Sequence, residues 1–373
     1  LSPLEGQQVT VRGIVTGDFQ AANQLNGFFI QQAIPDRNKA TSDGIFVFAP
    51  TRATPVQVGD YVQVSGAVLE FKSGSTDPQR LTQIGRLDRV DICGPTQLPR
   101  VTDVNLPLKD AADFESLEGM LVRIKEPMYV SEVFALGRFG ELVLSARDRL
   151  YHPNNHPRLS AEQTRDLNAR SRIVLDDGLS VQNPNPIPNL SAPDTSGTRR
   201  LGDTARGVQG VLTWGFDVYR IQPTQATVFE PRNARPAAPE RVGGELRAAS
   251  LNVLNYFTTL GSRGASNAPE LVRQRDKLVE TIIGLDADVL GLIEIENNQG
   301  TALSDLLAAV NARLVVIALE SLRRIVSSAT GLSIAWSAKD GAEAVSACAA
   351  DVPDLILMDL MMPRCDGITA TKS

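Results

Sequence analysis

The segments LRAASLNVLNYF (residues 246–257) and ADVLGLIEIENN (residues 287–298) contain the short apolar runs expected of buried parallel strands. Between them, Leu271, Leu278 and Ile282 recur at helical spacing in a run without breakers. The sequence therefore predicts a strand–helix–strand unit. Its first strand carries one amide, Asn252, and its second ends in the carboxylate of Glu294.

Asn252 and Glu294 are the residue types that a divalent cation site on this unit would need. Mg²⁺ takes one or two carboxylates together with phosphate oxygens, and an amide can orient a neighbouring ligand or phosphate. Both residue types are compatible with this chemistry. The alternative is that Asn252 caps a turn and Glu294 is an exposed acid at a strand end.

SLNVLNYF followed by DADVLGLIEIENN resembles the opening of the endonuclease/exonuclease/phosphatase fold, in the form found in large secreted bacterial nucleases. The resemblance implies a metal-dependent phosphodiesterase that acts on DNA or another nucleic acid outside the cell. It matches Asn252 to the asparagine of the first family motif and Glu294 to the metal-binding glutamate of the second. The resemblance therefore implies metal-side roles for both residues, with Mg²⁺ or another divalent cation such as Mn²⁺ or Ca²⁺ as the cofactor.

Residues 8–93 read as five strands with turn signals between them, and Gly13 interrupts the first strand. Five short strands with an internal glycine fit an OB-like barrel. The phrases LSPLEGQQVTVRGIVTGDFQ, NGFFIQQ and VQVGDYVQVSGAV resemble the N-terminal domain of the same nucleases.

An OB-like barrel suggests contact with single-stranded nucleic acid through stacked aromatics and nearby cations. Lys72, Arg80 and Arg86 are the predicted phosphate contacts. The candidate stacking residues are the aromatics of the barrel, Phe28, Phe29, Phe46, Phe48, Tyr61 and Phe71. The alternate-residue spacing of these aromatics favours a core role for most of them over a stacking role.

Residues 98–230 predict a second β-rich module, which we interpret as barrel-like over 112–230 and which includes a proline- and asparagine-rich loop at 183–197. The chain's 2 histidines, His152 and His156, lie in this module beside prolines that exclude a regular helix. The nuclease family uses a downstream histidine and further acidic motifs for acid–base chemistry. No histidine follows position 156 and the resemblance fades near Asn311, so we expect a catalytically incomplete nuclease domain.

From Leu314 the sequence resembles a different family, the response-regulator receivers, and most closely those of CheB-like chemotaxis methylesterases. DLILMDLMMPRCDG (residues 354–367) matches the third strand and following loop of a receiver, which implies that Asp359 is the phosphoacceptor and a histidine kinase the partner. The expected first strand, LVVI, is followed by Ala318 and Leu319 where the family has an acidic pair. The later strands, with their Ser/Thr and Lys, are missing, so this unit is also predicted to be incomplete.

The joint at residues 312–314 has no linker composition. Secreted nucleases and cytoplasmic receivers work in different compartments, and this mismatch favours a chimeric junction near residue 313, from gene fusion, assembly or frameshift, over a functional partnership. The nuclease resemblance implies an extracellular location, and the receiver resemblance implies a cytoplasmic one. The start at Leu1, inside strand-like sequence, suggests that an N-terminal segment is missing.

Composition sets wider limits. The chain has 373 residues, 42% of them hydrophobic, and a net charge of −6, so it has no broadly basic surface for nucleic acid. Its 3 cysteines are too scattered for a disulfide framework, and no apolar run is long enough to span a bilayer.

These patterns predict a multidomain chain in which all-β, OB-like structure precedes partial α/β units. The predicted divisions are an OB-like barrel at 1–97, a second β-rich module at 98–230, a linker at 231–244, the start of the nuclease domain at 245–313 and a truncated receiver at 314–373. Three functions stay open: a nuclease lineage, a phosphorelay regulator acting through Asp359, and a non-catalytic OB-fold module that binds nucleic acid.

Overall fold

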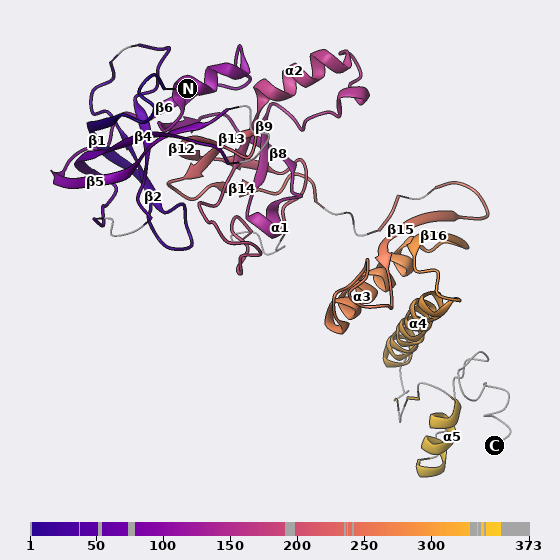
Figure 1. Ribbon diagram of the computed structural model, residues 1–373. Helices are drawn as coiled ribbons and strands as arrows, with labels where there is room; N and C mark the ends of the chain where they lie inside the picture. The colour runs from indigo at the N-terminus through magenta and orange to yellow at the C-terminus, as the bar shows by residue number, and fades with distance from the viewer. Residues whose placement is uncertain are drawn as a thin grey trace. The chain divides into compact units, whose positions relative to one another are not determined.

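The computed structural model divides into two compact units, residues 1–235 and residues 236–373 (Figure 1). Their boundary lies within the proline- and alanine-rich segment at 231–244. The structure describes residues 2–36, 38–50, 54–73, 79–190, 198–234, 236, 238–240, 242–328, 334, 337–338 and 341–351.

The first unit begins with a closed five-stranded barrel. Its strands are β1 (Gln8–Phe19), β2 (Gly27–Gln31), β3 (Gly44–Phe48), β4 (Asp60–Phe71) and β5 (Leu81–Pro95). They run in the order β1-β2-β3-β5-β4, and β4 pairs back to β1. Inward-facing side chains such as Val15, Phe28 and Ile84 fill the interior, because alternate residues of a strand point to opposite faces. The predicted strands at 8–93 thus form one self-closing sheet.

The second module is a nine-stranded sheet in the order β14-β11-β8-β9-β10-β13-β12-β7-β6. Among the described residues β14 and β6, the two outer strands of this order, do not pair with each other, so the sheet is not a closed barrel. The barrel-like interpretation of 112–230 was therefore wrong. The strands are β6 (Thr102–Val104), β7 (Leu121–Ile124), β8 (Met128–Glu132), β9 (Leu142–Ala146), β10 (Arg172–Leu175), β11 (Thr204–Arg206), β12 (Val208–Gly215), β13 (Val218–Pro223) and β14 (Val228–Glu230).

Short helices connect these strands. They are η1 (Ala111–Leu117), α1 (Leu136–Phe139), η2 (Pro153–Asn155) and α2 (Ala161–Ser171). Ser160 caps α2 by accepting a hydrogen bond from the Gln163 amide, while the Gln163 side chain accepts from the Ser160 amide. This reciprocal capping box explains why the helix begins there.

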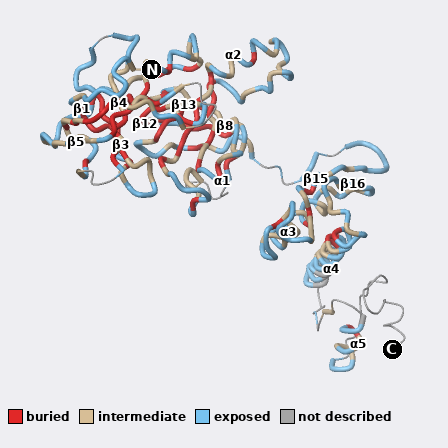
Figure 2. The backbone as a smooth tube through the Cα atoms, viewed as in Figure 1, coloured by how far each residue is buried: buried red, intermediate tan, exposed pale blue. Residues whose placement is uncertain are grey.

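The second unit contains the predicted strand–helix–strand motif. β15 (Ala248–Tyr256) and β16 (Val289–Ile295) pair in parallel, and α3 (Ala268–Leu285) connects them. Val253 and Tyr256 on β15 pack against Val279 of α3 and Leu306 of α4 (Thr301–Ser328). Exposed residues alternate with less exposed ones along both strands, and Figure 2 draws much of β15 and β16 in pale blue.

LVVI (residues 314–317) lies inside α4 and is not the first strand of a receiver, so that prediction was wrong. Residues 301–328 contain neither glycine nor proline, and extending an existing helix requires no new nucleus. A strand of a parallel sheet would instead need partner strands to pair with and helices to cover both faces of the sheet. Of the other predicted receiver elements, α5 (Gly341–Ala350) is a helix, and Asp359 lies outside the described residues.

The barrel and the nine-stranded sheet meet at a close backbone contact between Gly44 and Gly119. A Cβ atom on Gly44 would lie 2.2 Å from the Gly119 carbonyl oxygen, so only glycine fits there. The Leu121 amide donates to Gln31 Oε1 over 2.8 Å, and the Ser42 hydroxyl bonds the Glu118 carbonyl oxygen. These contacts hold the two sheets together as one unit.

Glu118 places a carboxyl group inside this junction. The residue is only 8% exposed, and its Oε2 atom has no hydrogen-bond partner among the described residues. Burial, and then repulsion from Glu115 and Glu70, raises the pKa of Glu118 to about 8. The neutral form is therefore favoured at the junction up to mildly alkaline pH.

We expect Glu118→Gln to stabilise the protein at pH 8 and to change little at pH 4. The raised folded-state pKa means that the unfolded chain loses this proton first, so wild-type stability falls as pH rises from about 4.5 to about 8. The amide removes that loss, which is on the order of 2–4 kcal/mol. Urea unfolding followed by tryptophan fluorescence across this pH range measures the difference.

Glu245→Gln is the matched control, because Glu245 is exposed and its replacement should shift stability by less than about 0.5 kcal/mol at any pH. Destabilisation by Glu118→Gln at pH 8 but not at pH 4 would show that the carboxyl is needed in its ionised form and would contradict this prediction.

Candidate functional site

The candidate site lies at the carboxyl ends of β15 and β16. In the parallel register Asn252 faces Ile293, so Glu294 is the next residue along the partner strand. The structure thus brings Asn252 and Glu294 to the same edge, with both residues exposed. Functional side chains commonly occupy this edge of parallel α/β sheets.

The backbone at this edge is irregular. The β15–β16 pairing shifts register between Asn252 and Tyr256, and Leu254 and Asn255 both have φ +53°. Glu294 has φ +66°. Left-handed conformations are costly for residues with a side chain, and they concentrate where the surrounding structure enforces them.

Two side chains hold this irregular segment in place. Asn252 Oδ1 accepts a hydrogen bond from the Leu254 amide at 2.8 Å, as in a turn cap. Gln274 on α3 donates its Nε2 hydrogens to the carbonyl oxygens of Val253 and Leu254, each at 2.9 Å. The capping alternative for Asn252 therefore describes its observed contact.

Glu296, which the sequence analysis did not select, has the most developed hydrogen-bond shell at this edge. Its Oε2 atom accepts from the Thr258 and Thr259 amides at 2.8 and 3.1 Å, and from Asn298 Nδ2 at 2.9 Å. Hydrogen bonding from Thr259, and then from Thr258, holds the pKa of Glu296 below its usual range. Glu296 belongs to the quoted motif EIENN, so the signal was present in the sequence.

A second polar cluster ties β15 to the helices. The Tyr256 hydroxyl bonds Asp305 of α4, and Arg275 Nη1 of α3 lies 3.1 Å from Asp305 Oδ1. Burial and the Asp305 hydrogen bond raise the pKa of the Tyr256 hydroxyl. Arg275 and Asp305 also line a groove of ≈ 640 Å³ between α3 and α4.

The donor set at the strand ends does not make a complete metal site. Within the described residues no three His, Cys, Asp or Glu side chains gather as metal ligands. Glu296 Oε2 accepts several hydrogen bonds and Asn252 Oδ1 accepts one from an amide, so Glu294 and Glu296 Oε1 are the carboxylate groups of this edge without such a hydrogen bond among the described residues. Two carboxylates hold Mg²⁺ with help from phosphate oxygens.

The three predicted phosphate contacts are exposed on the barrel. Lys72 follows β4, Arg80 precedes β5, and Arg86 lies on β5 with φ +47°. Phe28, Phe29 and Phe46 are buried, as the core interpretation predicted, whereas Phe71 is half exposed. No described helix has the length and apolar character needed to cross a bilayer.

Comparison with known proteins gives two family matches. The model described as "Response regulator receiver domain" matches residues 315–373, and "Domain of unknown function (DUF8508)" matches residues 94–233. The first match confirms the predicted receiver resemblance at the C-terminal end. The nuclease resemblance gains no support from either match and stays a prediction.

Individual relatives agree with the receiver match. A 56-residue stretch is 55% identical to protein-glutamate methylesterase/protein-glutamine glutaminase 1 of Bordetella avium, and covers 15% of this chain and 16% of that protein. The corresponding protein 3 of Pseudomonas aeruginosa is 52% identical over 56 residues, which is 15% of this chain and 17% of that protein. The chain thus spans about a sixth of the length of these curated relatives.

We expect the protection factors of the β16 amides in hydrogen exchange to be about two- to five-fold higher in Glu294→Gly than in the wild type. Glycine adopts the left-handed conformation without the cost that glutamate bears, although its greater freedom in the unfolded chain offsets part of the gain. Glu294→Val, with a branched side chain at the same φ, should reduce protection. Reduced protection in both variants would mean that the glutamate side chain itself stabilises the strand end.

Proposed function

We propose that residues 315–373 are a phosphoacceptor segment of the receiver type, with Asp359 as the acceptor and a histidine kinase as the partner. The observation that carries this proposal is the receiver match over the whole segment, together with 48–55% identity to the curated relatives over 56–57 residues. Such a segment works in the cytoplasm, where kinases and Mg²⁺–ATP are found.

Two features predict that phosphorylation of this segment is inefficient. Receiver chemistry needs acids that hold Mg²⁺ and a cation that balances the phosphoryl charge. Here the residues after LVVI are Ala318 and Leu319, and LVVI itself belongs to helix α4. Mg²⁺ would therefore have few protein ligands beyond Asp359.

We expect acetyl phosphate with Mg²⁺ to modify Asp359 well below one phosphoryl group per chain. The phosphoryl group moves to a carboxylate oxygen as acetate leaves, and intact-mass spectrometry detects the adduct. Asp359→Asn should abolish the signal, whereas Asp351→Asn, at the exposed end of α5, should leave it unchanged. A signal equal in wild type and Asp359→Asn would refute the assignment. Stoichiometric modification would mean that other residues complete the site.

A second candidate function is favoured by the barrel. We propose that it is an OB-like module that binds single-stranded nucleic acid weakly, in a chain of nuclease lineage. The strand order β1-β2-β3-β5-β4, with parallel pairing of β3 and β5, supports this proposal because OB-folds are five-stranded Greek-key barrels that bind oligonucleotides. This role would place the module with extracellular nucleases, and Glu294 with phosphate oxygens could hold a divalent cation only loosely.

We expect weak, salt-sensitive binding of a labelled single strand and no cleavage of plasmid DNA with Mg²⁺ or Mn²⁺. Replacing Lys72 and Arg80 together with Ala should flatten the dependence of log Kd on log salt by about 1.4, because each phosphate contact on a single strand contributes about 0.7. Fluorescence anisotropy between roughly 50 and 200 mM salt measures this slope.

Lys109→Ala with Arg158→Ala is the matched control, since it removes the same charge from exposed positions in the nine-stranded module. An equal change of the salt slope in both double variants would show that the effect comes from the net charge of the protein and not from contacts of Lys72 and Arg80 with phosphates. Robust cleavage that Glu294→Ala abolishes would contradict the incomplete metal site.

A further inference from the structure

The turn between β12 and β13 holds an aromatic side chain in an unfavourable place. Phe216 and Asp217 form this two-residue connection with φ +53° and +63°. Such hairpin turns favour Asn and Gly, because bulky residues strain in the left-handed region. Phe216 is nevertheless 69% exposed, so core packing does not explain its presence.

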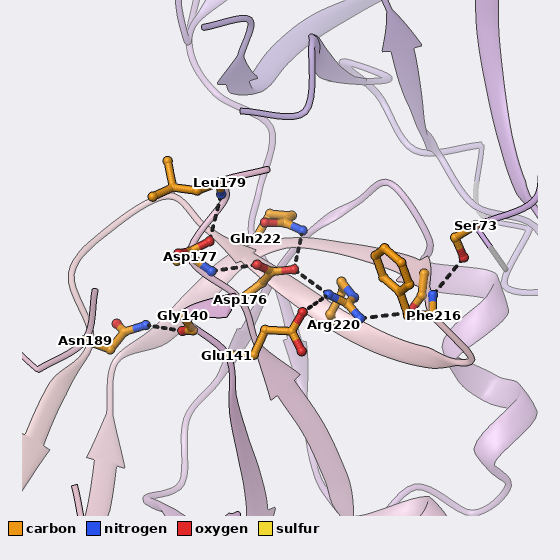
Figure 3. A network of polar contacts seen from close by, with 11 residues as sticks. Ser73, Gly140, Glu141, Asp176, Asp177, Leu179, Asn189, Phe216, Arg220 and Gln222 are labelled. Carbon is orange, nitrogen blue, oxygen red and sulfur yellow. Dashed lines mark hydrogen bonds and ion pairs between the residues drawn. The ribbon is translucent and has the colours of Figure 1, made fainter. Parts of the chain in front are cut away.

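A buried charge network fixes the inner face of this ring. The Arg220 guanidinium lies 5.2 Å from the Phe216 ring centroid. Arg220 Nη1 bonds Asp176 Oδ2 at 2.7 Å and Glu141 Oε1 at 2.8 Å, and Nη2 donates to the Gly215 carbonyl at 2.9 Å (Figure 3). The Arg220 side chain is only 5% exposed, so the ring rests on a rigid support, while most of the Phe216 surface stays exposed.

The same turn is anchored to the barrel. The Phe216 amide donates to Ser73 Oγ at 2.7 Å, as Figure 3 shows. Ser73 directly follows Lys72 after β4, and Arg80 precedes β5 at the other end of the same connection. Phe216 therefore lies beside Ser73, the residue that follows Lys72, one of the predicted phosphate contacts. Arg80 Nη1 lies 4.0 Å from Glu5 Oε1.

We propose that Phe216 is a base-stacking platform for single-stranded nucleic acid, and that Lys72 and Arg80 contact the phosphates beside the stacked base. The inference rests on the proposed binding function of the barrel and names the residue that engages the bases. Stacking accepts any base, since each has a π-face. A ring already held in place loses little conformational freedom on binding, so preorganisation raises the affinity. The strained turn costs folding stability, and a binding role would explain why phenylalanine is retained there.

The cations favour a polyanion over an uncharged ring-bearing ligand such as an oligosaccharide. Both ligands could stack on a phenyl ring, but only the nucleic acid carries a negatively charged phosphate next to each stacked unit. The ligand also has to be single-stranded, because bases in a duplex are already stacked on each other.

The test compares Phe216→Asn, Phe216→Trp and Phe134→Asn in the full chain, with an oligothymidine of about 12 nucleotides that carries 2-aminopurine. Asparagine tolerates the left-handed turn, so Phe216→Asn should unfold at the same temperature as the wild type or higher. It should weaken binding by about 5- to 100-fold and abolish the 2-aminopurine quenching that stacking produces. Phe216→Trp should retain both signals, and so should Phe134→Asn, which replaces another exposed phenylalanine.

Each outcome separates the inference from the function on which it rests. Equal affinity and quenching in Phe216→Asn and wild type would overturn the platform while leaving barrel binding intact. Absence of binding by the wild type at low salt would overturn both. Binding of an uncharged oligosaccharide that needs Phe216, without binding of the oligothymidine, would assign the ring to carbohydrate and overturn the inference.

Discussion

Sheets usually pair or protect their edge strands and cover their apolar faces, and the three sheets of the described residues meet this constraint to different degrees. The barrel closes β4 onto β1, so it leaves no open edge in its hydrogen-bonded order. β15 and β16 form a two-stranded parallel sheet whose inner face packs on helices and whose outer face exposes Val289 and Ile293. Parallel sheets are usually covered on both faces, whereas among the described residues of the second unit helices cover one face of this sheet.

The buried charges of the first unit have a structural consequence that reaches the surface. Arg220 could not remain in the sheet without Asp176 and Glu141, because an unpaired buried charge is strongly unfavourable. With both partners present, it supports the ring of Phe216 on the outside. The Ser73 contact then joins this support to the barrel, so one network connects the interior of one sheet with the loop of the other.

The C-terminal segment has a receiver sequence in a context that does not build a receiver sheet within the described residues. Local sequence similarity is retained over 315–373, yet LVVI continues the helix that starts at Thr301. Apolar β-branched residues fit either structure, and the choice depends on whether neighbouring strands are available. Here the residues just before LVVI are helical, and this favours propagation of the helix.

The sequence by itself determined the local elements: the five barrel strands, the β15–α3–β16 unit and the approach of Asn252 to Glu294 at one sheet edge. Alternation, helical spacing and turn residues are local signals, and they need no knowledge of distant contacts. Only the tertiary structure decided that the second module is a nine-stranded sheet, that LVVI is helical and that Phe216 lies against Arg220 and Ser73. Ser73 and Phe216 are 143 residues apart, and a contact across that separation follows from how whole sheets pack, which no local pattern encodes.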